Sequence, residues 1–449
     1  MSDALPLPPR PDLDQYRTLA RELQAASRSA DSGAVRAWAE RWVASLARLK
    51  VWAAAPEPRW LDHVTDQIAA RWRRLQAEHD GAARSALTAA QFFLARAHGF
   101  ASWPALVAHV GALGRGGTPI SRFEAAADAI VDGDAAQLEA FVADDPELVR
   151  ARSTRSHRST LLHYVSANGV EDFRQRTPAN IVAIAQFLLD AGADVNAESE
   201  AYGGRSTTLG LAATSVHPEE AGVQLELMQL LLDRGAVIDG PDGGSAVTGC
   251  LRNGRGAAAE LLAQRGARLD LEAAAGVGRL DVVERLVDAD GHPVAPATPR
   301  QLIDGFAWAC QFGRTAVVEL LLDRGFAIAT ALPHDGQTGL HWAAYTGHAD
   351  TVALLVRRGA PIDARDASYA GTPLEWALYG WGTSSPRSQH AGYYGAVATL
   401  VRAGAALDPA WVGDDPHRER AFTRAAADPR MTAALRGEPA ELLAQSRGS

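Results

Sequence analysis

Apolar residues recur at three- and four-residue spacing in short segments along most of the chain, and glycines close many of these segments. The clearest example is 337–366, QTGLHWAAYTGHADTVALLVRRGAPIDARD. Its first apolar face ends at Gly347 and its second at Gly359. Glycine suits such ends because it enters the left-handed backbone region without a side-chain clash. The pattern therefore predicts two short helices and a return turn.

Weaker copies of this pattern occupy most of the remaining chain. A single pair of helices cannot bury its apolar faces alone, so several copies must stack into one continuous core. Leu-Leu pairs and Gly-Ala stops predict eight copies, at 123–149, 160–195, 207–238, 246–269, 271–291, 302–328, 338–362 and 372–407. The fourth and fifth copies are short.

The seventh copy resembles an ankyrin repeat. The family pattern T-x-L-H-x-A-A-x-x-G-H, followed by V-x-x-L-L-x-x-G-A, matches Thr338, Leu340, His341, Ala343, Ala344, Gly347, His348, Val352, Leu355, Val356, Gly359 and Ala360. Gly339 stands where the family prefers proline. The resemblance implies an all-α ankyrin-repeat solenoid of stacked helix-turn-helix units with helical caps at both ends.

The region before the repeats has a different pattern, with helices predicted near 12–27, 33–54, 59–79, 86–98 and 103–113. Residues 87–110 resemble the short helical module that precedes the repeats in many bacterial ankyrin proteins. We interpret it as an end cap for the first repeat, with a docking element as the alternative. The predicted organisation is an N-terminal helical module at 1–115, repeats at 119–408, and a C-terminal helical cap and tail at 409–449.

Composition indicates a soluble globular protein, with 47% hydrophobic residues and a net charge of −9. An acidic chain without a long apolar run favours neither nucleic acid nor a membrane as a partner. No signal-sequence pattern follows Met1, so we expect a cytoplasmic protein. Cys250 and Cys310 are the only cysteines, which excludes a disulfide scaffold, and we expect both to be small buried side chains.

Motifs for catalysis are missing from the sequence. There is no phosphate-binding G-x-x-x-x-G-K-[ST], no dinucleotide fingerprint and no G-x-S-x-G elbow. His341 and His348 do not have the spacing of a helical metal pair. We therefore expect no metal, no cofactor and no enzymatic activity. The resemblance implies that His163 and His341, the histidines of the T-x-L-H motif, make hydrogen bonds between neighbouring repeats.

The resemblance also implies a protein partner that binds in a concave groove. Family members vary the two positions after the paired small residues according to their partner, and here these positions hold aromatic residues in three successive copies. Trp308, Trp342 and Trp376 occupy the same position in three successive copies, just before the paired small residues. They either pack between helices or form a binding stripe. The predicted partner-binding residues are Phe312, Tyr345, Tyr379, Trp381 and Tyr393.

Insertions between the two helices of a copy predict a second kind of site. They occur at 170–180, 216–223 and 381–394, and insertions at one point of a repeat emerge on one rim. Those of the second and third copies are neighbours. The alternative function is therefore a small-molecule-binding or enzymatic site at these rim loops, formed by His163, Tyr164, Asp172, Arg174 and His217.

Overall fold

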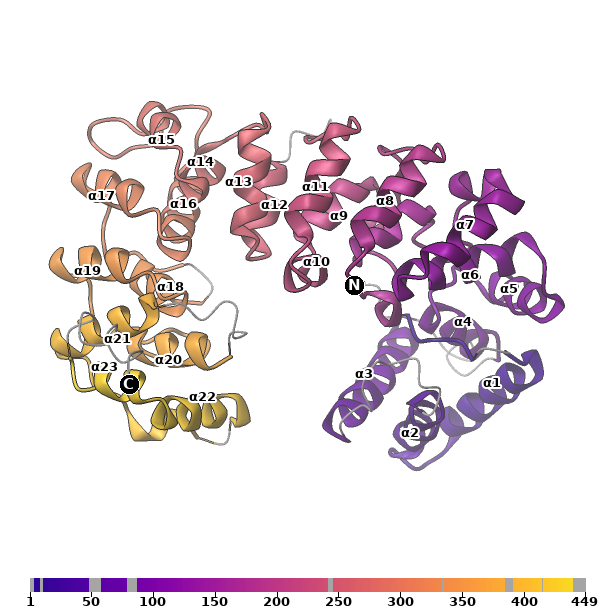
Figure 1. Ribbon diagram of the computed structural model, residues 1–449. Coiled ribbons are helices and arrows are strands. Elements are labelled where there is room, and N and C mark those ends of the chain that lie inside the picture. Colours follow the sequence, from indigo (N-terminus) through magenta and orange to yellow (C-terminus); the bar gives the residue numbers. More distant parts are fainter. Residues whose placement is uncertain are drawn as a thin grey trace. The chain divides into compact units, whose positions relative to one another are not determined.

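The computed structural model describes residues 4–8, 11–47, 58–78, 87–240, 245–332, 335–383, 391–413 and 415–438. The chain divides into two compact units, Met1–Ile238 and Asp239–Ser449 (Figure 1). Both units are built from helices, and the only paired strands in the described ranges are two residues each. The predicted all-α fold class is confirmed.

The first unit begins with five helices near the predicted positions. They are α1 (Leu13–Arg28), α2 (Ala34–Ala47), α3 (Pro58–Ala77), α4 (Leu87–Ala97) and α5 (Trp103–Arg115). Residues 48–54, the predicted end of the second helix, lie outside the described residues. Trp38, Trp42 and Trp72 are buried together with Leu23 and Leu94, so this module has its own aromatic core.

Three helix pairs complete the first unit. The elements are α6 (Pro119–Asp132), α7 (Ala135–Asp144), η2 (Pro146–Arg150), η3 (Leu161–Ser166), η4 (Asp172–Arg174), α8 (Ile181–Asp190), β1 (Glu198–Ser199), η5 (Ala201–Gly203), β2 (Ser206–Thr207), α9 (Thr208–Thr214), α10 (Val216–Glu220) and α11 (Gln224–Asp233). The first helix of the second copy is a 3₁₀ helix. Strands β1 and β2 pair antiparallel.

The second unit holds five helix pairs and a C-terminal pair. They are α12 (Ala246–Arg252), α13 (Gly256–Gln264), α14 (Leu271–Val277), α15 (Leu280–Leu286), α16 (Pro299–Gln311), α17 (Thr315–Asp323), α18 (Gly339–Tyr345), α19 (Ala349–Arg357), α20 (Pro373–Thr383), α21 (Gly392–Arg402), η6 (Pro409–Trp411), α22 (Pro416–Ala427) and α23 (Pro429–Ala434).

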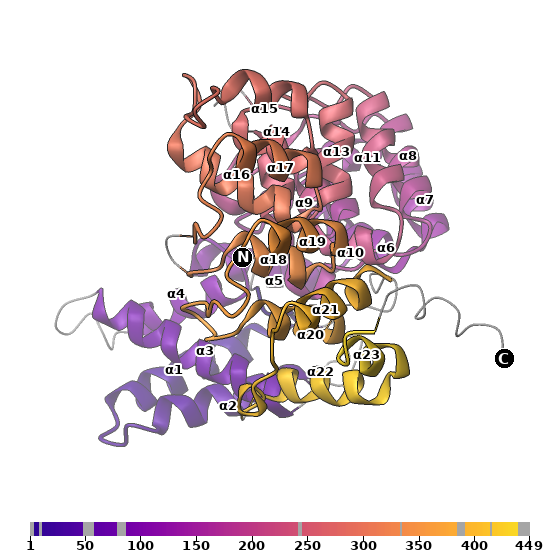
Figure 2. The same cartoon turned by 90° about the vertical axis from the view of Figure 1, so that its left-hand side faces the viewer.

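These helices form two layers. The first helices contact one another in the order α14, α16, α18, α20, α22, and the second helices in the order α15, α17, α19, α21, α23 (Figure 1). Figure 2 brings α17 and α19 to the front. One hydrophobic core runs from Leu271 to Ala434 between the layers. Cys310 is part of this core and Cys250 is also buried, as predicted, and burial raises the pKa of both thiols.

Glycines at the turn between the two helices of a pair make room for the next pair. A Cβ atom added at Gly313 would lie 2.5 Å from the His348 ring, and one added at Gly347 would lie 2.6 Å from the Tyr393 ring. Both glycines also have positive φ, 67° and 72°. The side chain that begins the second helix of one pair therefore packs on the turn glycine of the pair before it.

The T-x-L-H motif joins neighbouring pairs through hydrogen bonds, as predicted. The Thr338 backbone N–H donates to His341 Nδ1 at 3.1 Å, and His341 Nε2 donates to the Gly371 carbonyl oxygen at 3.1 Å. His163 repeats this geometry with Thr160 and the Ser206 carbonyl oxygen. Burial lowers the pKa of both histidines, which keeps the rings neutral.

The eighth copy carries a carboxylate in place of this histidine. Glu375 is fully buried and accepts the Thr372 N–H at 2.7 Å and the Asp408 N–H at 3.4 Å. A carboxylate only accepts hydrogen bonds, so here the following segment presents an N–H group where the others present a carbonyl.

None of the helices in the described ranges is long and apolar enough to cross a membrane.

Candidate functional site

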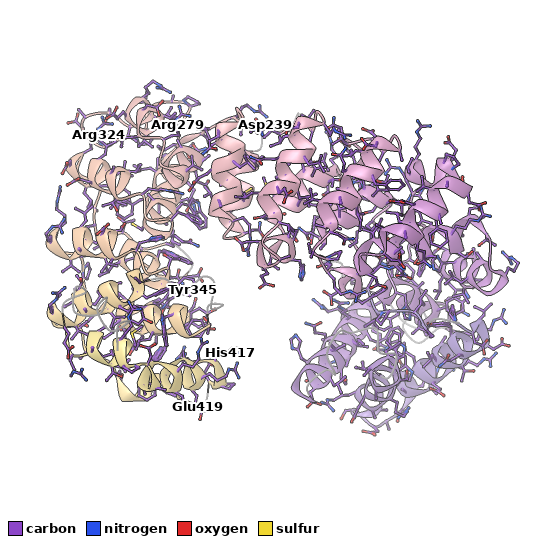
Figure 3. The ribbon with its side chains drawn as sticks, viewed as in Figure 1. Asp239, Arg279, Arg324, Tyr345, His417 and Glu419 are labelled. Carbon is purple, nitrogen blue, oxygen red and sulfur yellow. The ribbon has the colours of Figure 1, made fainter. Side chains whose placement is uncertain are left out.

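Five aromatic side chains gather on α18, α20 and the loop between the seventh and eighth copies. Figure 3 places Tyr345 on the same edge of the second unit as His417 and Glu419 of α22. We define the aromatic surface as Trp342, Tyr345, Tyr369, Trp376 and Tyr379. Tyr369 is 60% exposed and the other four are half-buried.

Trp376 lies at the centre of this surface. Its ring centroid is 5.3 Å from that of Trp342, 5.5 Å from that of Tyr345 and 6.2 Å from that of Tyr369. The three interplanar angles lie between 67° and 76°, so the rings meet edge to face. Edge-to-face contact is favourable for aromatic rings and limits their freedom to turn. The rings of this surface therefore hold one another in place.

Asp366 fixes the loop that carries Tyr369. Its carboxylate accepts the backbone N–H groups of Ser368, Tyr369 and Gly371 at 2.7–2.9 Å and the indole N–H of Trp376 at 3.0 Å. Burial raises the pKa of Asp366, but these four hydrogen bonds outweigh burial and leave the pKa below its ordinary value. The ionised carboxylate thus holds both the exposed tyrosine and the central tryptophan.

A second anchor reaches the same loop from α22. Arg418 donates to the carbonyl oxygen of Tyr369 at 3.1 Å and to that of Trp411 at 3.0 Å. Ala370, next to Tyr369, has a φ of 51°, a left-handed conformation that is strained for alanine. Residues in strained conformations persist only where their surroundings impose them, and they often mark functional sites.

The aromatic surface includes three tyrosines, whose hydroxyl groups affect one another's pKa. Burial raises the pKa of Tyr345, and the nearby hydroxyls of Tyr379 and Tyr369 raise it further. The pKa of Tyr379 is raised as well, by burial and by the nearby Asp415 and Tyr369. Within the described part of the chain none of these three hydroxyls has a hydrogen-bond partner. They are free to bind an incoming group.

The structure changes the predicted set of partner-binding residues. Trp381 and Tyr393 are each only 4% exposed, so the expectation that they extend an exposed strip is wrong. Trp381 lies in α20, which continues to Thr383, and packs against Tyr394 and Arg424. Tyr393 fills the space above Gly347. Residues 384–390, in the middle of the predicted insertion, lie outside the described residues.

Phe312 pairs with Trp308 of the same helix pair, with ring centroids 6.4 Å apart. It is half-buried, and its ring would touch a Cβ atom added at Gly256 of α13. Trp308, Trp342 and Trp376 occupy the matching helices α16, α18 and α20, as their shared phase predicts. Sequence reasoning missed Tyr369 and Asp366, although an aspartate followed by A-S-Y-A-G is a recognisable turn signal.

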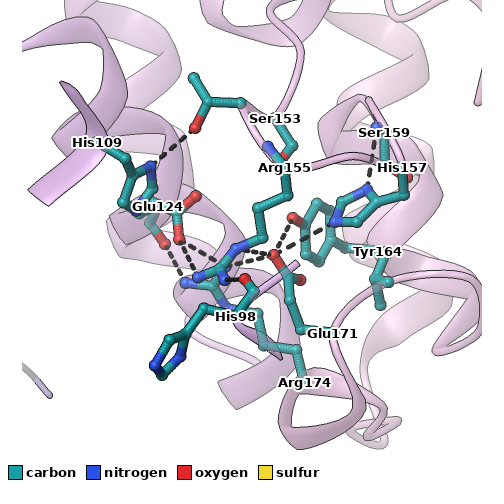
Figure 4. A network of polar contacts seen from close by, with 12 residues as sticks. His98, His109, Glu124, Ser153, Arg155, His157, Ser159, Tyr164, Glu171 and Arg174 are labelled. Carbon is teal, nitrogen blue, oxygen red and sulfur yellow. Dashed lines mark hydrogen bonds and ion pairs between the residues drawn. The ribbon is translucent and has the colours of Figure 1, made fainter. Parts of the chain in front are cut away.

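The alternative site is replaced by a buried network of charges in the first unit (Figure 4). Arg174 is 3% exposed and donates to Glu124 at 2.8 Å and to Asp128 at 2.8 Å. Glu171 lies between Arg174 and Arg155. Burial alone would raise the pKa of Glu171, but the two guanidinium groups hold it well below its ordinary value. The network therefore consists of ionised carboxylates paired with arginine guanidinium groups.

This network accounts for most of the residues predicted to bind a small molecule. Arg174 is neutralised by carboxylates, Tyr164 is buried and donates to Glu171 at 3.3 Å, and His163 is used by the repeat motif. These three are therefore corrected from ligand-binding to structural positions. Asp172 is exposed and His217 is half-buried on α10.

A cleft of about 820 Å³ opens in the first unit between α3, α4 and the loops of the second copy. Asp172 lines it, as do the exposed aromatic side chains Phe92 and Tyr202. The charged residues of the lining are Arg71, Arg74, Glu78, Arg96, Asp172 and Glu200. Three arginines face three carboxylates, so charge does not favour a ligand of either sign. Among the residues described, no group of three or more His, Cys, Asp or Glu side chains has the arrangement of a metal site.

Stacked helix pairs, joined by hydrogen bonds from His163 and His341 to carbonyl oxygens of the next pair, define the class of this protein as a helical repeat protein. Residues 271–366 and 306–382 match the family model described as ankyrin repeats in three copies. Residues 271–382 of the chain therefore contain ankyrin repeats. No curated protein matches the chain.

Two solved ankyrin-repeat domains are similar to this chain. One is that of Bcl-3, a member of the IkappaB protein family, with 20% identity over 61% of this chain and 97% of that chain and a TM-score of 0.28. The other is human ASB11, with 21% identity over 63% and 99% and a TM-score of 0.30. Ankyrin repeats are generally protein–protein interaction modules.

Proposed function

We propose that this protein is a scaffold that binds a protein partner through the aromatic surface of its second unit. The observation that carries this proposal is the array of rings around Trp376, drawn from two helices and one loop, at whose edge Tyr369 is 60% exposed. Tyrosine and tryptophan are enriched at the centres of protein interfaces because each combines a large apolar area with a polar group.

The rigidity of the surface supports the same proposal. A partner that binds mobile side chains must order them, which opposes binding by about 0.5–1.5 kcal/mol for each flexible side chain. Asp366 and Arg418 have already ordered the loop of Tyr369, and edge-to-face contacts hold Trp376. Most of the contact energy is then available for the partner.

The test compares alanine variants in affinity capture from the native cell. Tyr369→Ala and Tyr379→Ala should each weaken retention of the partner, by a factor of about 30 for a loss of about 2 kcal/mol. Tyr202→Ala is the matched control, because Tyr202 is a 57% exposed tyrosine of the other unit. If both variants keep the parent's circular dichroism and capture the partner as well as the control does, this surface is not the contact.

A further inference from the structure

The cleft of the first unit, between α3, α4 and the loops of the second copy, separates charge between its two walls. Three arginines and one carboxylate line the wall that includes α3 and α4, and two carboxylates line the loop wall. The arginines are Arg71, Arg74 and Arg96, and the carboxylates are Glu78 on the helical wall and Asp172 and Glu200 on the loop wall. Positive and negative groups are therefore equal in number, but the helical wall is basic and the loop wall is acidic.

Charged side chains next to these walls in the sequence are engaged elsewhere. On α3, Asp66 pairs with Arg36 of α2 at 2.9 Å. Beside the loop wall, Arg205 pairs with Glu198 at 3.5 Å, and Arg158 donates to a backbone carbonyl oxygen at 3.2 Å. None of these side chains lines the cleft. They leave the opposite signs of the two walls unchanged.

Three charged groups of the cleft are available to a ligand. Arg74, Arg96 and Glu200 are exposed, and no ion pair joins them to another side chain within the described ranges. A guanidinium group matches the geometry of a carboxylate, and a carboxylate accepts hydrogen bonds from an ammonium group. The rings of Phe92 and Tyr202, 39% and 57% exposed, line the same cleft. A ligand with an anionic end, a cationic end and an apolar middle complements this arrangement.

The two walls are fixed to each other before a ligand binds. The Ser156 N–H donates to the Gly99 carbonyl oxygen at 2.7 Å, and the Glu200 N–H donates to the His157 carbonyl oxygen at 2.7 Å. Tyr202 has a φ of 53°, a left-handed conformation that is strained for tyrosine, and such strain often marks functional sites. A cleft ordered in advance loses little conformational entropy when it binds a ligand.

The size and the neutral groups of the cleft suit a peptide. Its volume of about 820 Å³ lies within the range of roughly 300–1,000 Å³ that is typical of small-molecule sites. A single amino acid carries its two charges only a few bonds apart and would leave most of this volume to water. Gln67 and Ser156 also line the cleft, and an amide and a hydroxyl can both donate to and accept from peptide groups.

We infer that this cleft binds a short peptide whose amino and carboxyl ends are both free. The inference goes beyond the proposed function, because it concerns a second site in the other unit. The peptide carboxylate binds Arg74 and Arg96, and its ammonium group binds Glu200. The side chains between the two ends pack on Phe92 and Tyr202.

Isothermal titration calorimetry with the full chain and the peptide Ala-Phe-Leu-Ala tests this inference. The peptide is compared with its N-acetylated form, its C-amidated form and the form blocked at both ends. The free peptide should bind, and each singly blocked form should bind at least about tenfold more weakly, because each loses one charged hydrogen-bonding group. The doubly blocked form should bind most weakly. Added salt should weaken binding of the free peptide.

Variants of the two walls assign each end of the peptide. The double variant Arg74→Gln/Arg96→Gln should bind the free and the amidated peptide equally, and Glu200→Gln should bind the free and the acetylated peptide equally. Arg73→Gln and Glu198→Gln are the matched controls, since both residues are exposed neighbours that do not line the cleft. Both controls should bind all four peptides as the parent does. Circular dichroism checks that each variant is folded.

Three results would overturn this inference. They are no binding of the free peptide, equal binding of the free and the doubly blocked peptide, and equal effects of the wall variants and their controls. The proposed function is measured separately, by partner capture through the second unit. Tyr369→Ala should therefore bind the peptide as the parent does, and failure of the peptide would leave the result of partner capture unchanged.

Discussion

Arg155 donates a hydrogen bond from Nη1 to the carbonyl oxygen of His98 at 2.8 Å, and so joins the loop between the first and second repeats to the residue that follows α4. The same guanidinium forms ion pairs with Glu171 and Glu124 and lies over the Phe100 ring at 5.2 Å. One arginine therefore connects the N-terminal module to two repeats. This contact makes the module a structural part of the first unit.

Replacing Arg155 should destabilise the first unit strongly. Arg155→Ala leaves Glu171 buried beside one guanidinium instead of two, and breaking a buried ion pair costs about 3–5 kcal/mol. Urea unfolding followed by tryptophan fluorescence measures the loss. Arg176→Ala is the control, because the Arg176–Asp132 pair is also close, at 2.7 Å, but exposed, and its loss should cost at most about 1 kcal/mol. Equal losses in the two variants would show that the buried network adds no special stability.

Stability should fall as pH decreases below neutrality. Burial lowers the pKa of His98 to about 3 and the pKa values of His109 and His163 to about 4, all in the first unit. As pH falls through about 6.5, the unfolded chain takes up protons that the folded chain excludes. Each histidine then lowers the free energy of unfolding by up to about 1.4 kcal/mol per pH unit.

Urea unfolding at pH 7.0 and pH 5.5, as two chosen conditions, checks this dependence. His98→Asn keeps a donor for the Leu5 carbonyl oxygen but does not titrate, so its stability should depend less on pH than that of the parent. An unchanged dependence in His98→Asn would rule out this histidine as a cause.

Restoring the family's histidine in the eighth copy should be harmful. In Glu375→His the ring can accept the Thr372 N–H, but its other nitrogen then carries a proton that faces the Asp408 N–H. A buried donor left without an acceptor costs about 1–3 kcal/mol. Thermal unfolding of the second unit measures the effect. His341→Glu is the reverse exchange, and it should destabilise because a carboxylate would face the Gly371 carbonyl oxygen. Stabilisation by Glu375→His would contradict this account.

The turn glycines should differ in their tolerance of alanine. Gly347→Ala adds a Cβ atom 2.6 Å from the Tyr393 ring, whereas nothing lies within 4 Å of the same atom at Gly359. Both residues have positive φ, 72° and 83°, so both variants have a similar backbone cost of about 1–2 kcal/mol. Gly347→Ala should lose about 1–3 kcal/mol more by overpacking, measured by thermal unfolding. Equal melting temperatures would show that Tyr393 can move aside.

The sequence by itself determined the helix pairs of this protein and their stops, and its resemblance to ankyrin repeats implied the role of the repeat histidines. These features depend on residues close together in the chain, such as the apolar spacing that ends at Gly347 and the Thr338–His341 cap. Local spacing sets helix faces, and the same four-residue cap repeats at Thr160 and His163. Pattern and structure agree for these helix ends and caps.

Only the tertiary structure decided which polar and aromatic side chains remain available. The sequence offered Trp381, Tyr393, Arg174 and Tyr164 as candidate binding residues, yet all four are buried. Tyr369 became part of a surface because Asp366, Trp376 and Arg418 meet there from a loop, α20 and α22. Exposure and charge pairing depend on neighbours distant in the chain, and a periodic pattern carries no information about which neighbours those are.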